Sequence, residues 1–291
     1  MALGIGIIGA GKHGERYLRH VADVPDLRLV ALARRDRARG EAQARVYGCR
    51  FHNDAADLIA DPEVDAVALV VPPTSNAALA SSAARAGKHL LIEKPLATTL
   101  GDCRRIADAV ASSGVTAMVA HTLRFNAVVA AMRAAIATIG PLHAAVITQR
   151  FEPSTLTWLD TPAVGGGGII LHTGVHSFDL LRHLTGDEAR EVSARVDRVA
   201  THDTEDNFVA AIEMERGTLA LVGGSRATAG RSGAIELAGR NGQLVGDHVH
   251  GHAAVLTGTE RRALTVGAPV ATVAAALREF AAAVGARRPP S

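Results

Sequence analysis

The chain has 291 residues, of which 48% are hydrophobic and 21% charged, a composition typical of globular rather than disordered proteins. Lys and Arg number 31 against 29 Asp and Glu, and aromatic residues make up 3%, so no nucleic acid or membrane is expected as a partner. Two cysteines outside any Cys-x-x-Cys motif favour a reducing, cytoplasmic location. We also expect no signal peptide and no apolar stretch of the ~20 residues that span a membrane.

Strand-like and helix-like segments alternate over residues 1–121. The expected strands are Leu3–Ile8, Leu27–Ala33, Ala66–Val71, His89–Ile92 and Thr116–Ala120. The expected helices are Lys12–Val24, Asp36–Tyr47, Ser75–Ala86 and Gly101–Ser113. Strands separated by helices of this length imply right-handed crossovers and a parallel sheet. We therefore predict an α/β fold for this first domain.

The pattern changes over residues 122–291, where the expected strands from residue 191 to residue 248 follow one another without intervening helices. The expected helices here are Asn126–Ile139, Ile169–Leu184 and Thr272–Val284. The expected strands are Leu142–Arg150, Glu191–Val199, Phe208–Glu215, Thr218–Ser225, Gly233–Ala238 and Gln243–His248. The turn at residues 215–217 is typical of a hairpin. This predicts a second, α+β domain built on an open, mostly antiparallel sheet.

The first strand leads directly into a G-x-G-x-x-G motif, here Gly9-Ala10-Gly11-Lys12-His13-Gly14. A preceding strand and a following helix are the context in which this motif binds dinucleotides. Gly9 permits the tight turn, Gly11 lets the backbone approach a pyrophosphate, and Gly14 lets the helix pack close to the strand. The helix start then offers unpaired N–H groups to the phosphates. The alternative is a glycine-rich turn without a ligand.

The second strand ends in Arg34, Arg35 and Asp36. Chains that bind NAD usually carry an acidic residue near this position, where it holds the ribose 2′-hydroxyl. Arginines offer planar donors suited to a 2′-phosphate instead. The sequence therefore favours NADP(H) over NAD(H). In the alternative, both arginines are solvated and Asp36 holds the ribose of NAD.

Further motifs follow the glycine loop along the chain. They are Pro72-Pro73, Glu93-Lys94-Pro95, Arg124-Phe125-Asn126, and Gly166-Gly167-Gly168 placed shortly before His176. Together these motifs resemble the glucose–fructose oxidoreductase, inositol dehydrogenase and rhizopine-catabolism family (Gfo/Idh/MocA), from about Ile5 to Phe280. The resemblance implies a Rossmann domain, an α+β domain whose open sheet often joins subunits into a homodimer or homotetramer, and NAD(P)-dependent oxidation of CH–OH groups. A sugar, cyclitol or similar small polyol or carbonyl compound is the implied substrate.

The resemblance also implies the site residues. Lys94 and His176 are the expected catalytic residues, and Arg124, Trp158 and His172 are expected to bind substrate. Histidine, with an ordinary pKa of ~6.5, suits the transfer of the hydroxyl proton, while the nicotinamide carries the hydride. Lys94 would hydrogen-bond the reacting oxygen. Because it follows a parallel strand, we expect it to face the ligand cleft together with His176.

The cofactor-binding set combines the glycine loop with loops at other strand ends. Its members are Gly9, Gly11, Lys12, His13, Gly14, Arg34, Arg35, Pro72, Asn76, Glu93, Lys94 and His121. Two residues depart from the family's usual pattern: His172 stands where Asp is common, and Asn76 where His is common.

Histidine clusters raise the question of a metal. His172 and His176 would share one helix face, and three histidines at residues 248–252 would share one face if they form a strand. No third ligand or glutamate base stands at metalloprotease spacing, so no metal site is expected. Two other functions stay open: a glycoside hydrolase that uses NAD as a transient redox relay, and a cofactor-binding regulator without turnover.

Overall fold

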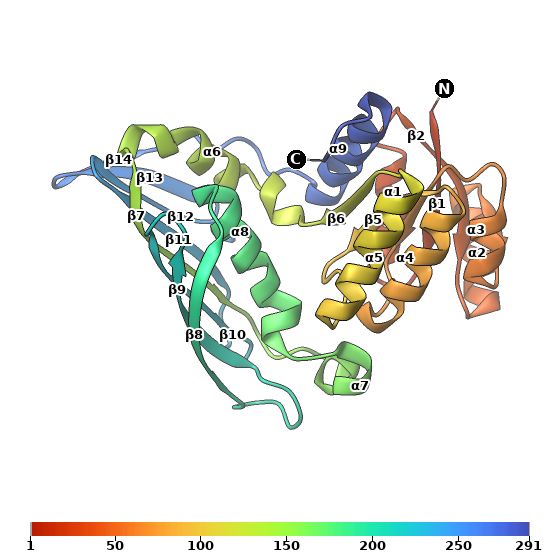
Figure 1. Cartoon of the computed structure of the whole chain (residues 1–291), viewed down its shortest axis with the longest axis horizontal. Coiled ribbons are helices and arrows are strands. Elements are labelled where there is room, and N and C mark those ends of the chain that lie inside the picture. Colours follow the sequence, from red (N-terminus) through yellow and green to blue (C-terminus); the bar gives the residue numbers. More distant parts are fainter. Residues whose placement is uncertain (1, 291) are drawn as a thin grey trace. The chain divides into compact units, whose positions relative to one another are not determined.

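The computed structural model describes residues 2–290, which form two compact units. The first contains residues 2–122 and 271–290, and the second contains residues 123–270. This differs from the division into residues 1–121 and 122–291 predicted from the sequence, because the last helix, α9 (Thr272–Ala286), packs against α1 (Gly14–Val21) of the first unit (Figure 1). Its apolar side chains, such as Leu277 and Phe280, are fully buried there.

The first unit is the predicted α/β fold with a parallel sheet. Its strands lie in the order β3 (Arg50–His52), β2 (Leu27–Ala33), β1 (Leu3–Ile8), β4 (Ala66–Leu69), β5 (His89–Glu93) and β6 (Ala117–Ala120). The connecting helices are α1, α2 (Arg37–Tyr47), α3 (Ala55–Ala60), α4 (Asn76–Arg85) and α5 (Leu100–Ser113). The strand order reverses between β1 and β4. In open α/β sheets this switch point is where ligands bind.

The short elements β3 and α3 were not predicted from the sequence, because they are too short to show a hydrophobic period. The longer elements agree with the predictions to within a few residues. The glycine predicted to end the second helix, Gly48, has a φ of +64° and donates its N–H to the Ala44 carbonyl.

The second unit is built on a mostly antiparallel sheet, as predicted. Its strands lie in the order β14 (Glu260–Ala263), β13 (His252–Thr257), β12 (Gly242–Asp247), β11 (Ser232–Gly239), β7 (Leu142–Arg150), β10 (Leu219–Ser225), β9 (Asn207–Met214) and β8 (Ala189–Asp197). The neighbours β7 and β10 are parallel. The hairpin predicted at residues 215–217 joins β9 to β10.

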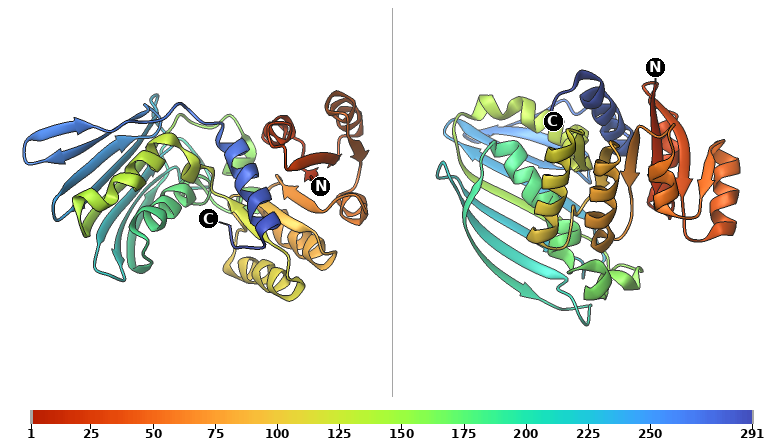
Figure 2. Two further views of the ribbon diagram at one scale, coloured as in Figure 1. Left: turned by 90° about the horizontal axis from the view of Figure 1, so that it is seen from above. Right: turned by 45° about the vertical axis from the view of Figure 1, so that its right-hand side comes forward.

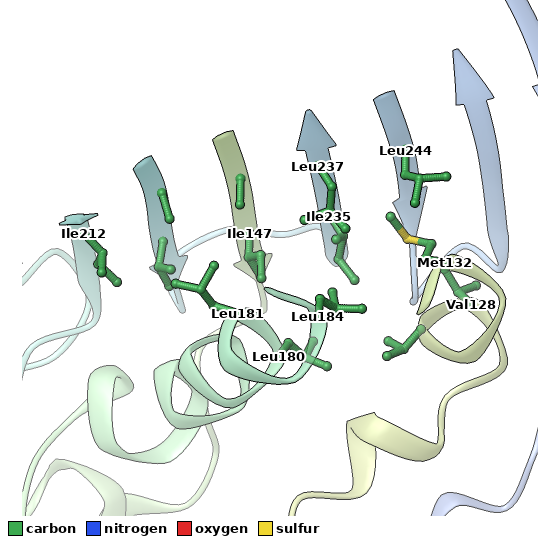
Figure 3. Close-up of a cluster of buried hydrophobic side chains, with 14 of the residues drawn as sticks. Val128, Met132, Ile147, Leu180, Leu181, Leu184, Ile212, Ile235, Leu237 and Leu244 are labelled. Carbon is green, nitrogen blue, oxygen red and sulfur yellow. The ribbon is translucent and has the colours of Figure 1, made fainter. Parts of the chain in front are cut away.

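Helices α6 (Ala127–Ala135) and α8 (Val175–Thr185) lie on one face of this sheet (Figures 1 and 2). Their apolar side chains pack against the apolar side chains that the strands direct toward this face (Figure 3). The residues labelled in that core are Val128, Met132, Ile147, Leu180, Leu181, Leu184, Ile212, Ile235, Leu237 and Leu244. The core therefore fixes α8 firmly against the sheet.

Several segments of the second unit differ from the sequence-based expectation, and strands β13 and β14 were not predicted. The helix predicted over residues 169–184 begins as a π-helical segment, η5 (Ile170–Gly174), before α8 starts. Residues 248–251 form a turn, so the histidines at 248, 250 and 252 are not aligned on one strand face. Within residues 2–290, no helix combines the length and apolarity needed to cross a membrane.

Candidate functional site

The glycine loop between β1 and α1 has the geometry that a pyrophosphate requires. Gly9 has a φ of +97°, and a Cβ there would overlap the Val70 carbonyl. A Cβ at Gly14 would overlap the Gly9 carbonyl, so the helix packs tightly on the loop. Gly11 is exposed and has nothing within 4 Å of where its Cβ would stand. The middle glycine is thus the one that leaves the backbone open to a ligand.

A pocket of ≈ 500 Å³ lies at this loop, at the switch point between β1 and β4. Its lining comes from the ends of β1, β2 and β4 and the loops that follow them. The predicted cofactor residues Gly9, Gly11, Arg34, Arg35 and Pro72 are part of it, together with Asp36 and Asn53. Because the pocket combines an open glycine backbone with arginines at the end of β2, its residues fit a dinucleotide.

The two arginines after β2 differ in what they contact. The Arg34 guanidinium donates to the Ala10 carbonyl at 2.7 Å and to the Gln43 side chain at 2.8 Å. Asp36 is the N-cap of α2 and accepts the Arg39 N–H at 3.1 Å. Arg35 is exposed, and no side chain or backbone group within residues 2–290 bonds its guanidinium. Arg34 therefore braces the glycine loop, while Arg35 is open to a ligand.

Glu93, at the end of β5, is tied to helix α1. Its Oε1 accepts a hydrogen bond from the Tyr17 hydroxyl at 2.6 Å and lies 2.7 Å from His13 Nε2. Burial by itself raises the pKa of Glu93, but the contact with His13, the Lys94 charge and the Tyr17 bond together hold that pKa below its usual value. Burial and the neighbouring carboxylate raise the pKa of Tyr17. Glu93 thus joins the start of helix α1 to the turn that carries Lys94.

The remaining predicted residues of the first unit surround the same sheet edge. Lys94 and His121 directly follow β5 and β6, whose carboxyl ends lie at the edge that carries the glycine loop. Both are partly buried, and the bond between Lys94 and Pro95 is cis. Lys12 is exposed on the glycine loop. Asn76, in contrast, is 1% exposed.

In the second unit the structure brings together two residues predicted to bind substrate. The Trp158 and His172 rings meet edge to face, with centroids 5.6 Å apart. His172 is buried in the π-helical segment, and His176 is partly buried in the first turn of α8. A Cβ on Gly165 would stand 3.0 Å from His172 Nε2. The absence of a side chain at Gly165 therefore leaves room for the imidazole of His172.

An acidic loop that the sequence analysis missed holds this segment. Glu205 accepts the backbone N–H groups of Gly168 and Ile170 at 3.1 Å. Buried Arg226 donates to Thr173 Oγ1 at 3.3 Å, and burial lowers the pKa of this arginine. Glu205 was the available signal, but its backbone partners Gly168 and Ile170 lie 37 and 35 positions away in the sequence.

Asp160 closes the same loop from the Trp158 side. Its carboxylate accepts the backbone N–H groups of residues 202–204, and these bonds, those from His202 and Thr204 first, hold the pKa of Asp160 well below its usual value. Loop 202–206 is therefore bonded both to the Trp158 turn and to the His172 segment.

Arg124, predicted to bind substrate, makes a bidentate ion pair with Asp179 of α8, at 2.8 and 2.6 Å. Asp179 is 6% exposed. The pair fixes the chain entering the second unit to the helix that carries His176. As for metals, the described residues contain no group of three or more His, Cys, Asp or Glu side chains that could hold an ion.

Two family models match the chain. The model described as "Oxidoreductase family, NAD-binding Rossmann fold" matches residues 3–121, and the GFO/IDH/MocA C-terminal domain matches residues 129–245. Myo-inositol 2-dehydrogenase of Thermotoga maritima is 30% identical over 87% of this chain and 78% of its own length. Inositol 2-dehydrogenase of Rhizobium meliloti is 31% identical over 85% of this chain and 76% of its own length.

Solved structures share the fold. An oxidoreductase domain protein from Kribbella flavida has a TM-score of 0.92 at 23% identity, covering 100% of this chain and 92% of its own. Levoglucosan dehydrogenase in complex with NADH and levoglucosan has a TM-score of 0.91 at 22% identity, again covering 100% of this chain and 92% of its own.

Proposed function

The chain belongs to the Gfo/Idh/MocA family of oxidoreductases, and on that premise we propose that it transfers a hydride between a nicotinamide dinucleotide and a hydroxyl-bearing carbon of a sugar or cyclitol. One observation carries the proposal: the pocket at the β1–β4 switch point. At this pocket the Gly11 backbone is open to a ligand, and the close packing around Gly9 and Gly14 leaves no room for a side chain. A chain that used this loop only as a turn would not need an open backbone there.

The proton is the part of the reaction that the protein must handle, because a bound nicotinamide supplies the hydride chemistry. His176 would take the hydroxyl proton in oxidation and return it in reduction. Lys94 would donate a hydrogen bond to the reacting oxygen and favour its anionic form. Trp158 and His172, already in contact, would form part of the substrate pocket.

NADP(H) is the proposed cofactor, with NAD(H) the alternative. Exposed Arg35 supports it, because a guanidinium is a good partner for a 2′-phosphate. Asp36 supports it as well, because its carboxylate caps α2. The substrate would be a small polyol or the matching carbonyl compound. Inositol and sugar dehydrogenases among the relatives support that class.

The test is a screen of cyclitols, aldoses and anhydrosugars that follows absorbance of the reduced cofactor, with NAD and NADP in parallel. We expect turnover with a higher kcat/KM for NADP, and strong loss of kcat in Lys94→Ala and His176→Ala with cofactor affinity retained. Cleavage of a glycoside without net cofactor reduction would favour the redox-relay hydrolase. Cofactor binding without turnover on any substrate would favour the regulator.

A further inference from the structure

Asn76 is placed as an anchor of the turn that follows Lys94. It is the first residue of α4, immediately after the turn η1 (Pro73–Ser75), and it is 1% exposed. Its Nδ2 donates to the carbonyl oxygens of Pro95 and Leu96, each at 3.1 Å. Both amide hydrogens are therefore used on the backbone directly after Lys94.

Glu93 anchors the other side of Lys94. Its carboxylate meets Tyr17 and His13 of the first helix, as described above. Lys94 thus stands between two residues whose positions are set from different helices: Glu93 from α1, and Pro95 from α4 through Asn76. A side chain whose backbone is held on both sides has few directions in which to point.

Burying the Asn76 side-chain amide is unfavourable in free energy, because one of its polar atoms has no partner in residues 2–290. Its Oδ1 is buried, and no hydrogen-bond donor reaches it within the described residues. Exchanging the amide ends would turn the oxygen toward two carbonyl oxygens, so the orientation is fixed. A buried acceptor without a donor is unfavourable, and a residue serving only to fill space would be apolar. The two donated bonds are therefore what the site requires.

We propose that Asn76 is a positioning residue for Lys94, acting through the Pro95–Leu96 backbone rather than by binding the cofactor. This inference rests on the proposed catalytic role of Lys94. The two N–H groups of the Asn76 side chain hold the Pro95–Leu96 backbone in place. The Lys94 ammonium therefore keeps one direction and one electrostatic environment. Loss of the donors would leave the glycine loop in place and misdirect the ammonium.

The test uses the full chain and two variants of the anchor. Asn76→Asp keeps the shape but replaces the donors with an acceptor facing two carbonyls, and Asn76→Ala removes the group. The matched control is Ser81→Ala, because Ser81 is also buried and lies on the same helix. We expect kcat to fall about 10- to 100-fold in both Asn76 variants, with the larger loss in Asn76→Asp, while NADPH affinity changes little.

A second measurement does not depend on turnover. The chain contains three lysines, Lys12, Lys88 and Lys94, so competitive acetylation followed by peptide mass spectrometry resolves each of them. The pH dependence of Lys94 acetylation should shift in both Asn76 variants and stay unchanged in Ser81→Ala. Exposed Lys12 serves as the internal reference.

Each outcome decides the proposal. A shifted Lys94 profile together with reduced kcat supports it. Wild-type kcat with an unchanged Lys94 profile overturns it, and so does a loss of NADPH affinity alone, which would make Asn76 a cofactor ligand. A lowered Tm with an unchanged Lys94 profile overturns it as well, because the role would then be structural. If Lys94→Ala itself keeps full activity, the proposed function fails, while the acetylation profile still decides whether Asn76 positions Lys94.

Discussion

Arg34 and Arg35 show how two identical neighbouring side chains acquire different tasks. The sequence assigned both to the cofactor, and both line the pocket. In the structure the Arg34 guanidinium is committed to the Ala10 carbonyl and to Gln43, whereas Arg35 is exposed. Arg34 therefore contributes to the shape of the glycine loop, and Arg35 is the better placed of the two to bind a 2′-phosphate.

The first prediction concerns this difference. Arg35→Ala should raise the KM for NADP about 10- to 100-fold and change the KM for NAD much less, because a charge-assisted hydrogen bond contributes about 1.5–3 kcal/mol. Steady-state kinetics with both cofactors measures it. Arg37→Ala is the control, because Arg37 is also exposed but pairs with Glu41 at 3.3 Å. An equal rise in the KM for NAD and for NADP would show that Arg35 does not distinguish the two cofactors.

At the scale of elements, the glycine run before His172 contains positions with different steric requirements. A Cβ at Gly168 would overlap the Glu205 carbonyl, whereas at Gly167 the nearest atom would be 3.5 Å away. Only Gly168 therefore needs to be glycine for its contact with the acidic loop. The tight contact is what places the π-helical segment against residue 205.

Gly168→Ala should consequently lower stability by about 1–3 kcal/mol, the usual range for forcing extra volume into a packed site, and reduce kcat as the His172 segment shifts. Gly167→Ala should behave like the wild type in both respects. Urea unfolding and steady-state kinetics on the two variants provide the comparison. Equal tolerance of alanine at both positions would contradict the role given to Glu205.

Helix α8 also carries His183, a residue that should make the stability of the fold depend on pH. Burial, with the nearby Arg133 and Arg124 charges, lowers the pKa of His183 to about 4. In the unfolded chain this histidine has its ordinary pKa of ~6.5 and takes up a proton more readily than in the folded chain. Its contribution to stability is therefore fully present above pH ~6.5 and declines as the pH falls toward 4. The slope should be smaller in His183→Asn.

Thermal unfolding from pH 4 to 8 tests this expectation. His143→Asn, at an exposed histidine on β7, is the control and should keep the wild-type slope. Identical slopes in the wild type and His183→Asn would mean that other groups set the acid sensitivity.

For the whole molecule, the open face of the second unit's sheet is the main unexplained surface. No helix of that unit covers it in the described structure (Figure 2). Val209, Leu219 and Leu221 lie there with 43%, 62% and 40% of their surface exposed. Apolar side chains gathered on one sheet face favour association between copies of the chain.

A homodimer or homotetramer is therefore expected in solution. Leu221→Arg should lower the mass measured by light scattering after size-exclusion chromatography, because it places a charge within the apolar surface. Val46→Arg, on α2 of the first unit, is the control, since Val46 is 78% exposed. A wild-type chain that already runs as a monomer would contradict the expectation.

The sequence by itself determined the alternation of strands and helices, the glycine loop, the hairpin and the family motifs around Lys94 and His176. These features depend on the local periodicity of hydrophobic residues and on residues close together in the chain, so they can be predicted without the tertiary structure. It also assigned Asn76 to the cofactor set, since position in a motif was the only information available.

Only the tertiary structure decided which partners the polar side chains meet. Tyr17 and Glu93 are 76 positions apart, and Arg124 and Asp179 are 55 apart, so no local pattern announces either contact. The same holds for α9, whose apolar face does not reveal which unit it covers. Burial favours a donor or acceptor for most polar groups, but the choice of partner depends on how distant segments pack.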